Sequence, residues 1–307
     1  MLKQRKNKNG KRIGKKISKT KRNKKRSSKR NKKRSSKRNK KRSSKRNKKR
    51  SSKRNKIVRG GSISKFLTSE TNNPTDIIEI GRGGAGVAYL DKSQPDSVFK
   101  ISDKSVTCRV WGKEASIYKQ MEKFKVDTPL CKILKMKEYE NHGDICYMEL
   151  TRAYNPRGDD ANYTIQPRFQ DDTYEYIYKG RGHFLGVSNL KAENIFTDDN
   201  INDYIRDLGI LMARLHYKVK NDGYDLELFI SKEENGIIIY IADFDLSELY
   251  KVITPRIIER LEWSLSAFPY FPIDGNLYDI FSKNYIEEAT KYGMKETAEK
   301  VLRLYTE

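Results

Sequence analysis

The stretch Asp76–Tyr89 reads DIIEIGRGGAGVAY, and it is followed by the apolar run VFK that ends at Lys100. Apolar and β-branched residues on both sides of a glycine cluster predict a strand, a tight turn and a second strand. Gly81, Gly83 and Gly86 form the pattern G-x-G-x-x-G. A dinucleotide-binding turn needs this pattern between a strand and a helix, so that interpretation is excluded here. A glycine-rich turn between two strands can instead fold its backbone N–H groups over phosphates.

The elements around this turn predict a small sheet with one helix, followed by a more helical half. The expected strands of the first half are Asp76–Ile80, Val87–Tyr89, Ser97–Ile101, Leu130–Tyr139 and Asp144–Leu150, and its helix is Cys108–Phe124. Residues 155–182 are polar and carry no assignable pattern. We then expect a helix at Ile201–Tyr217, strands at Leu226–Ser231 and Gly236–Ala242, and helices over about the last 55 residues with a break at 268–274. The fold class is therefore α+β.

Lys100 and Glu114 are the first candidate pair. Lys100 ends an apolar strand, and Glu114 lies inside the predicted helix. A lysine buried in a strand needs an anionic partner, and a glutamate on the packing helix supplies one. Such a pair can aim the ammonium group at the phosphates of a nucleotide.

The order of glycine turn, VFK, helix glutamate and the strand Cys146–Leu150 resembles the N-lobe of the protein-kinase-like fold. This resemblance implies a two-lobed domain with a reduced helical C-lobe. It also implies that Met148 is the gatekeeper and that Glu149 begins the hinge, whose backbone would read the adenine of ATP.

The resemblance requires catalytic and metal-binding residues in the second half, and two stretches compete for that role. Asn189–Phe196, NLKAENIF, mimics a kinase catalytic loop, but it has asparagine at the aspartate position and precedes its helix instead of following it. We therefore prefer the stretch that begins at Asp222. The resemblance implies that Asp222 serves the acceptor hydroxyl and that Glu227 and Asp243 hold Mg²⁺.

Residues 208–230 more closely resemble a divergent kinase-like family of unknown function that is best known in fungi. In that family a similar run precedes a D-F-N or D-F-D triplet, which here is Asp243–Asp245. The chain departs from ordinary kinases by having Asn221 and Tyr224 in the loop, no A-P-E triplet, and only 64 residues after Asp243. We expect Asp225 to cap a turn rather than act as a third acid, and His216 to be structural.

The charge of the chain is divided very unevenly. Of the 65 Lys and Arg residues, 32 lie in residues 1–56, which contain no acidic residue; the remaining 251 residues carry the other 33 and all 40 Asp and Glu, a net charge of −7. From Lys21 the octad KRNKKRSS repeats four times. This composition predicts a disordered tail that binds nucleic acid or other polyanions without reading sequence, or a neutral expansion. Arg-Ser-Ser units are also potential phosphorylation sites.

The expected domains are a tail at 1–56, a linker at 57–75, an N-lobe at 76–151 and a C-lobe at 152–307. No apolar run is long enough for a membrane span, and the N-terminus lacks the apolar core of a secretory signal. Three cysteines without a CxxC pair argue against a disulfide framework and a thiolate zinc site. We therefore expect an intracellular location, cytoplasmic or nuclear. The chain is rich in Lys, Asn, Ile and Tyr, which indicates an AT-rich genome and a large DNA virus as a source; the location would then be the virion or the host cell.

Together these features predict an ATP- and Mg²⁺-dependent phosphotransferase that acts on a protein or small-molecule hydroxyl. One alternative is a pseudokinase that binds nucleotide or acts as a scaffold. The other is a polyanion-binding protein that acts through its tail. The acceptor and the oligomeric state do not follow from the sequence.

Overall fold

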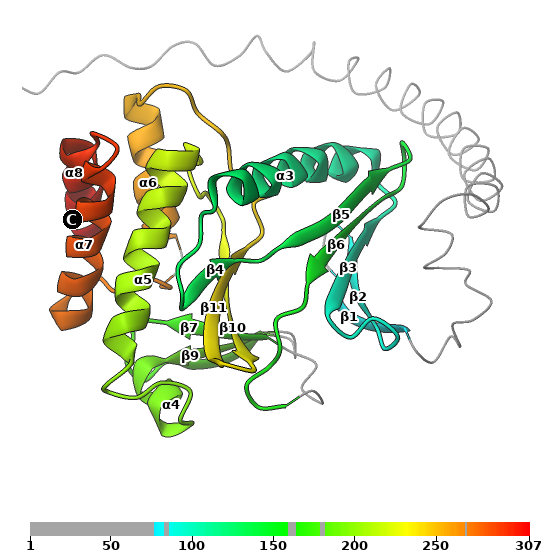
Figure 1. The fold of residues 1–307 in the computed structure, drawn as a ribbon, viewed down its shortest axis with the longest axis horizontal. Helices are drawn as coiled ribbons and strands as arrows, with labels where there is room; N and C mark the ends of the chain where they lie inside the picture. The colour runs from blue at the N-terminus through cyan, green and yellow to red at the C-terminus, as the bar shows by residue number, and fades with distance from the viewer. Residues whose placement is uncertain (1–76, 83–85, 159–163, 179–181, 268) are drawn as a thin grey trace, which may run out of the picture. The chain divides into compact units, whose positions relative to one another are not determined.

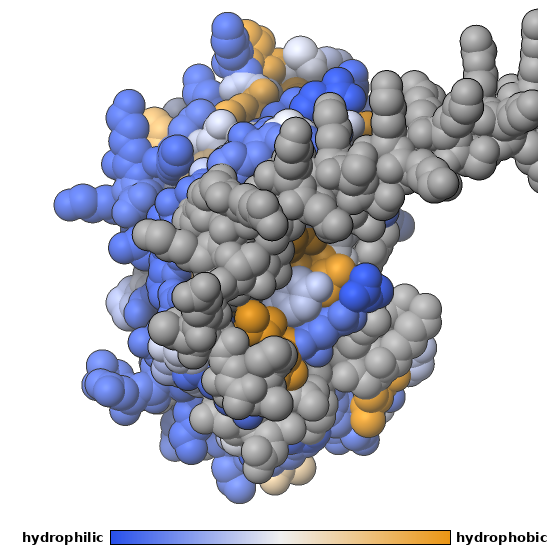
Figure 2. All heavy atoms as spheres, turned by 90° about the vertical axis from the view of Figure 1, so that its right-hand side faces the viewer, coloured by the Kyte–Doolittle hydropathy of each residue, from blue (hydrophilic) through white to orange (hydrophobic). Residues whose placement is uncertain are grey.

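The computed structural model describes residues 77–307 except 83–85, 159–163, 179–181 and 268, so the predicted tail and linker lie outside the described residues. The chain forms two β-sheets with helices packed on them, which confirms the α+β class (Figure 1). Among the described residues no helix is long and apolar enough to cross a membrane. The coloured part of the face shown in Figure 2 is mostly hydrophilic, with small hydrophobic areas.

The first sheet has five antiparallel strands in the order β1-β2-β3-β6-β5. Its strands are β1 (Ile77–Arg82), β2 (Val87–Asp91), β3 (Ser97–Ser102), β5 (Met136–Asn141) and β6 (Cys146–Thr151). Helix α3 (Ser105–Phe124) lies along this sheet (Figure 1). Its buried residues recur every three or four positions, as on one face of a helix, and it ends at Lys125, which adopts a left-handed conformation.

The second sheet has six strands in the order β4-β11-β10-β7-β9-β8. Its strands are β4 (Cys131–Ile133), β7 (Thr164–Arg168), β8 (Glu175–Tyr178), β9 (Gly182–Gly186), β10 (Glu227–Glu233) and β11 (Gly236–Ala242). The helices of this half are α4 (Val187–Ala192), α5 (Ile201–Ala213), the π-helix η2 (Arg214–Val219), α6 (Pro255–Ser266), α7 (Gly275–Thr290) and α8 (Lys295–Thr306). The hairpin β10–β11 turns at Gly236, which has a positive φ of 122° that favours glycine.

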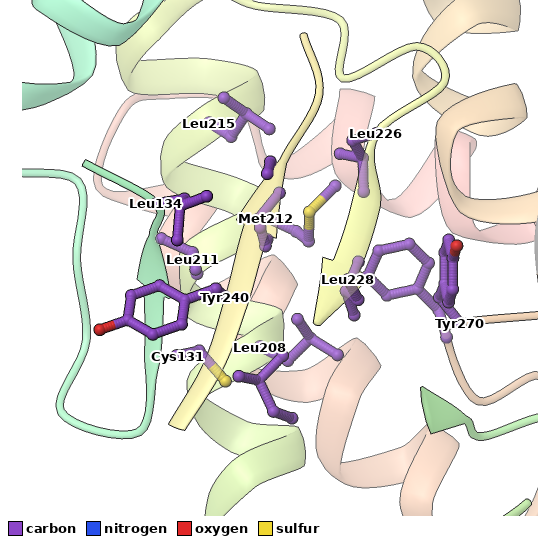
Figure 3. Packing of buried hydrophobic residues seen from close by; sticks show 14 of the residues in the cluster. Cys131, Leu134, Leu208, Leu211, Met212, Leu215, Leu226, Leu228, Tyr240 and Tyr270 are labelled. Carbon is purple, nitrogen blue, oxygen red and sulfur yellow. The ribbon is translucent and has the colours of Figure 1, made fainter. Parts of the chain in front are cut away.

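Apolar side chains of α5 and η2 pack against β10 and β11 and form the centre of the core (Figure 3). The helix supplies Leu208, Leu211, Met212 and Leu215, which follow its 3.6-residue period, and all four are fully buried. Glu227 is the first residue of β10, and Asp243 directly follows the last residue of β11.

Two expectations were wrong, for residues 130–139 and for the cysteines, and one unassigned stretch, residues 155–182, contains strands. Residues 130–139 form two strands, and β4 pairs in parallel with β11 of the second sheet instead of joining the first. Residues 155–182 contain β7 and β8, which are short and lie next to segments without a periodic pattern. Cys108 and Cys146 form a disulfide that joins α3 to β6, although they are 38 residues apart in sequence. Cys131 is free and buried.

Candidate functional site

A cavity of about 460 Å³ lies between the two sheets and contains five of the predicted site residues in its lining. These are Gly81, Gly86, Lys100, Glu227 and Asp243. They come from β1, the glycine-rich turn, β3, the start of β10 and the end of β11. Gly83 lies outside the described residues. A cavity of this size is typical of sites for small molecules and cofactors.

Lys100 is the residue that connects the two halves of the site. Its Nζ lies 3.2 Å from Oδ1 of Asp243 and 3.7 Å from Oε1 of Glu114. It also lies 5.3 Å from the ring centroid of Trp111 on α3. Burial opposes the charged form of Lys100, but Asp243 and Glu114 outweigh it and raise the pKa of the ammonium group above its ordinary value.

Glu114 does not line the cavity but lies behind Lys100 on α3. Its side chain is completely buried. Burial raises the pKa of this carboxyl group, and the charge of Lys100 opposes that rise. The predicted Lys–Glu pair is therefore present, with the glutamate on the face of α3 that packs on the sheet.

Asp243 follows directly after β11 and has a left-handed backbone conformation with φ 63°. This region is uncommon for residues other than glycine and costs free energy, so the surrounding packing must hold it. Phe244 is completely buried and packs edge-on against Tyr118 of α3, and the Asp243 N–H donates to the Tyr118 hydroxyl. These contacts direct the Asp243 carboxylate toward Lys100.

The floor of the cavity next to Lys100 carries several carboxylates. Glu227 pairs across the hairpin with Ala242, so its side chain starts one residue away from Asp243. Burial and the charge of Asp243 raise the pKa of Glu227, and the same two causes raise the pKa of Asp245 to about 6. Asp225 lies in the turn before β10 with φ 62°, and burial and the charge of Asp243 raise its pKa, but it does not line the cavity.

This donor set fits a Mg²⁺ ion that also binds nucleotide phosphates. Mg²⁺ in such sites usually takes one or two carboxylates, while phosphate oxygens and water complete its octahedron. Glu227 and Asp243 supply two carboxylates whose mutual repulsion a cation would relieve. Within the described ranges no three His, Cys, Asp or Glu side chains come close enough to hold a metal by themselves.

Asp222, the predicted partner of the acceptor hydroxyl, is completely buried and absent from the cavity lining. Its Oδ1 accepts from the backbone N–H groups of Tyr224 and Glu248, at 3.2 and 2.9 Å, and its Oδ2 accepts from Arg260 of α6. Arg260 also stacks on the ring of Tyr224. Asp222 therefore links the loop before β10 to the segment after β11. Both of its carboxylate oxygens already accept hydrogen bonds, so neither is available to the hydroxyl of a phosphate acceptor.

The residues predicted as gatekeeper and start of the hinge do not line the cavity. Met148 is completely buried and pairs with Lys100 across the first sheet, while the Glu149 side chain accepts from Ser97 at 2.7 Å. The lining of the cavity instead includes Leu150, Thr151, Arg152 and Ala153.

The cavity also contains residues that the sequence did not reveal. Phe229 lies two residues after Glu227, so the alternation of a strand could have placed it on the same face. Thr164, Gln166 and Phe184 come from β7 and β9, where the sequence has no recognisable pattern. Asp245, which the sequence predicts as an additional carboxylate near the metal site, also lines the cavity.

The structure also shows where His216 and the stretch that begins at Asn189 lie. The rejected stretch that begins at Asn189 lies on α4 and in the turn after it, and the Asn189 amide donates to the carbonyls of Thr173 and Tyr174. None of that stretch lines the cavity.

His216 is completely buried between the Tyr285 hydroxyl and Ser264, and burial lowers its pKa to about 3. It is structural, but in the neutral form rather than as a cation at a helix end.

Comparison with known proteins adds no relative to this picture. No family model matches the chain, and no curated protein matches its sequence.

Proposed function

We propose that this protein is an ATP- and Mg²⁺-dependent phosphotransferase of the protein-kinase-like fold, with a reduced helical C-lobe. The observation that carries the proposal is the position of Lys100, whose ammonium contacts both Glu114 and Asp243 at the edge of a cavity that the glycine-rich turn also lines. Asp243 is 143 residues away from Lys100 in sequence, so the contact depends on the fold. A lysine ammonium held between two carboxylates beside a glycine-rich segment is an arrangement suited to phosphoryl transfer.

In this proposal each residue at the site has one task. Backbone N–H groups of the turn that includes Gly81 and Gly86 cradle the phosphates, and Lys100 binds them through its ammonium group. Glu227 and Asp243 hold Mg²⁺, which neutralises phosphate charge when it is bound. The backbone at Leu150–Ala153 binds the base.

Asp245 is the carboxylate best placed to accept the proton of the acceptor hydroxyl. It lines the cavity, and its pKa of about 6 is close to the working range of a general base. Asp222 would first have to leave Arg260, because its oxygens are already occupied.

The test is a thermal-shift titration of the full chain with ATP, with and without Mg²⁺, followed by a phosphate-transfer assay. Wild type should be stabilised by ATP and more strongly by ATP with Mg²⁺, because a ligand that binds only the folded state raises its stability. Asp243→Ala should lose the Mg²⁺-dependent part. Glu262→Ala, at a position without a role at the cavity, serves as the control. No nucleotide-dependent shift in wild type would reject the proposal.

A catalytically weak pseudokinase is the second candidate, and the burial of Asp222 beneath Arg260 is the observation that favours it. A protein of this kind would show the nucleotide shift without phosphate transfer to itself, to generic protein substrates or to small alcohols. The thermal and transfer assays together distinguish the two candidates.

A further inference from the structure

Arg168, the last residue of β7, is buried, and two of its three side-chain nitrogens have no hydrogen-bond partner. Only 7% of the residue is exposed, and its Nε and Nη1 atoms are buried with no hydrogen-bond partner. An arginine remains charged in proteins, and a charged donor without a partner costs several kcal/mol when it is buried. The fold therefore retains a positive group whose partner is not another part of the described chain.

The strand pattern places Arg168 on the face of the second sheet that forms the cavity floor. Thr164 and Gln166 line the cavity, and Arg168 is the next residue of β7 with the same orientation. Ile165 pairs with Ile230 of β10, and the same antiparallel register carried three residues further brings Arg168 opposite Glu227. Charge interaction between Arg168 and Glu227 agrees with this position. Arg168 is not itself among the residues that line the cavity, but it lies next to Gln166 and opposite Glu227, which do line it.

Aromatic rings surround the guanidinium group of Arg168. Its carbon lies 4.2 Å from the ring centroid of Phe184 and 4.7 Å from that of Tyr270. Phe184 lines the cavity, and the Tyr270 hydroxyl donates to Oε1 of Gln166 at 2.6 Å, so both rings belong to the same wall. Stacked arginines of this kind are restrained in plane and suited to binding carboxylate or phosphate.

Arg168 is not simply the counter-ion of Glu227. The two residues interact through their charges, but no nitrogen of Arg168 lies within 4.0 Å of a Glu227 oxygen. Lys100 and Arg260 form such close pairs with Asp243 and Asp222 in the same region. Nε and Nη1 of Arg168 therefore have no hydrogen-bond partner within the described chain.

We propose that Arg168 binds an oxyanion, a phosphate or carboxylate group, carried by the molecule that accepts the phosphoryl group. This inference rests on the proposed function, because it treats the part of the cavity beyond Glu227 as the acceptor subsite. Neighbouring strands lie about 4.8 Å apart, so the anion at Arg168 and a hydroxyl beside Glu227 and Asp245 are separated by only a few bonds. The acceptor is then a small hydroxylated acid or phosphate ester rather than a segment of a protein.

The experiment measures anion binding to the full chain in the presence of saturating Mg²⁺ and a non-hydrolysable ATP analogue. Sulfate serves as the tetrahedral probe and acetate as the planar one, each titrated by thermal shift. The variants are Arg168→Met, Arg168→Lys and, as the control that removes one exposed arginine, Arg256→Met. The basic N-terminal residues are the same in all of them, so their contribution cancels.

Wild type and Arg256→Met should show saturable stabilisation by sulfate or by acetate, and the probe that saturates at lower concentration identifies the acceptor as a phosphate ester or a carboxylic acid. Arg168→Met should weaken this binding at least tenfold, and Arg168→Lys should weaken it severalfold because the planar group is lost. Equal affinity in wild type and Arg168→Met, or no saturable effect in wild type, would overturn the inference. If Arg168→Met fails to fold, unchanged affinity in Arg168→Lys overturns it instead.

The same titrations separate this inference from the function on which it rests. A nucleotide shift should persist in Arg168→Met, because Gly81, Gly86, Lys100 and Asp243 are intact in that variant. A normal nucleotide shift without anion binding rejects the acceptor subsite alone. Absence of the nucleotide shift in wild type rejects the phosphotransferase, and with it the assignment of Arg168 to an acceptor.

Discussion

At the scale of single residues, the site depends on which carboxylates reach the cavity. Asp222 and Asp245 both stand at positions that sequence reasoning connected with phosphoryl transfer, but only Asp245 lines the cavity. The other is saturated by two backbone N–H groups and Arg260. Their substitutions should therefore have different consequences.

Asp245→Asn should retain Mg²⁺-dependent nucleotide binding and reduce phosphate transfer by about 10²–10⁴-fold, the range that general-base catalysis contributes. Asp222→Asn should instead lower the stability of the protein by about 3–5 kcal/mol, because it leaves Arg260 without its charge partner. Urea unfolding and single-turnover transfer assays measure the two effects. A stable Asp222→Asn protein with impaired transfer and a fully active Asp245→Asn protein would reverse the assignment.

The glycine turn offers a second test at the residue scale. A Cβ atom at Gly86 would lie 2.5 Å from the backbone oxygen of Ile101 and 2.9 Å from the Trp111 ring, whereas at Gly81 the nearest atom is 3.8 Å away. Gly86→Ala should therefore cost about 1–3 kcal/mol of stability through overpacking and weaken nucleotide binding. Gly81→Ala is the matched control and should be close to wild type in urea unfolding. Equal stability of the two variants would contradict the close packing at Gly86.

At the scale of elements, helix α3 is held to the first sheet by a covalent bond as well as by packing. The disulfide of Cys108 and Cys146 connects the helix that carries Glu114 to the strand that pairs with β3. A crosslink that closes a loop of this length stabilises a fold by about 3–4 kcal/mol in the chain-entropy description.

Reduction with dithiothreitol should therefore lower the melting temperature of wild type. Cys108→Ser should behave like the reduced protein and should not respond to the reductant. Cys131→Ser is the control that keeps the bond and should still respond. Mass spectrometry without reductant identifies the bonded pair, and two free thiols at Cys108 and Cys146 would contradict the disulfide.

The buried His216 of the π-helix η2 makes the stability of the folded protein depend on pH. The pKa of His216 is about 3 in the folded protein and ordinarily 6.5, so between these values only the unfolded state takes up the proton. Stability should be fully present above pH 6.5 and fall by about 1.4 kcal/mol for each unit of pH below it.

His216→Gln should reduce this pH dependence relative to wild type, and His142→Gln, at an exposed position, should not. Urea unfolding at pH 7.5 and pH 5.5 measures the difference between the variants, so that contributions from carboxylates cancel. An unchanged slope in His216→Gln would show that this histidine does not remain neutral in the folded protein.

At the scale of the whole molecule, the charge of the chain divides into a basic N-terminal segment and an acidic remainder. Residues 1–56 have no aromatic side chain to stack on bases, so any binding of nucleic acid should depend on phosphate charge alone. Deletion of residues 1–56 should abolish retention of DNA and RNA, and the intact chain should lose most of its binding between 50 and about 200 mM salt. Unchanged retention after the deletion would exclude the N-terminal segment as a polyanion-binding region.

Part of the fold and of the candidate site could be predicted from local sequence patterns. The glycine turn, the strand that ends at Lys100, the helix that carries Glu114 and the hairpin between Glu227 and Asp243 were all predicted at nearly their observed bounds. These elements have strong periodicity or glycine turns, which act over a few residues. The sequence by itself therefore determined the α+β class and five of the residues in the cavity lining.

The tertiary structure alone decided which groups meet. The disulfide, the transfer of β4 to the second sheet, and the place of Arg168 opposite Glu227 all depend on pairing between segments that are far apart in the chain. The pairing of Asp222 with Arg260 also depends on tertiary structure, because Arg260 comes from helix α6. Spacing along a chain specifies local conformation, but the burial and charge partners that set the chemistry of a carboxylate are supplied by the packing of distant elements.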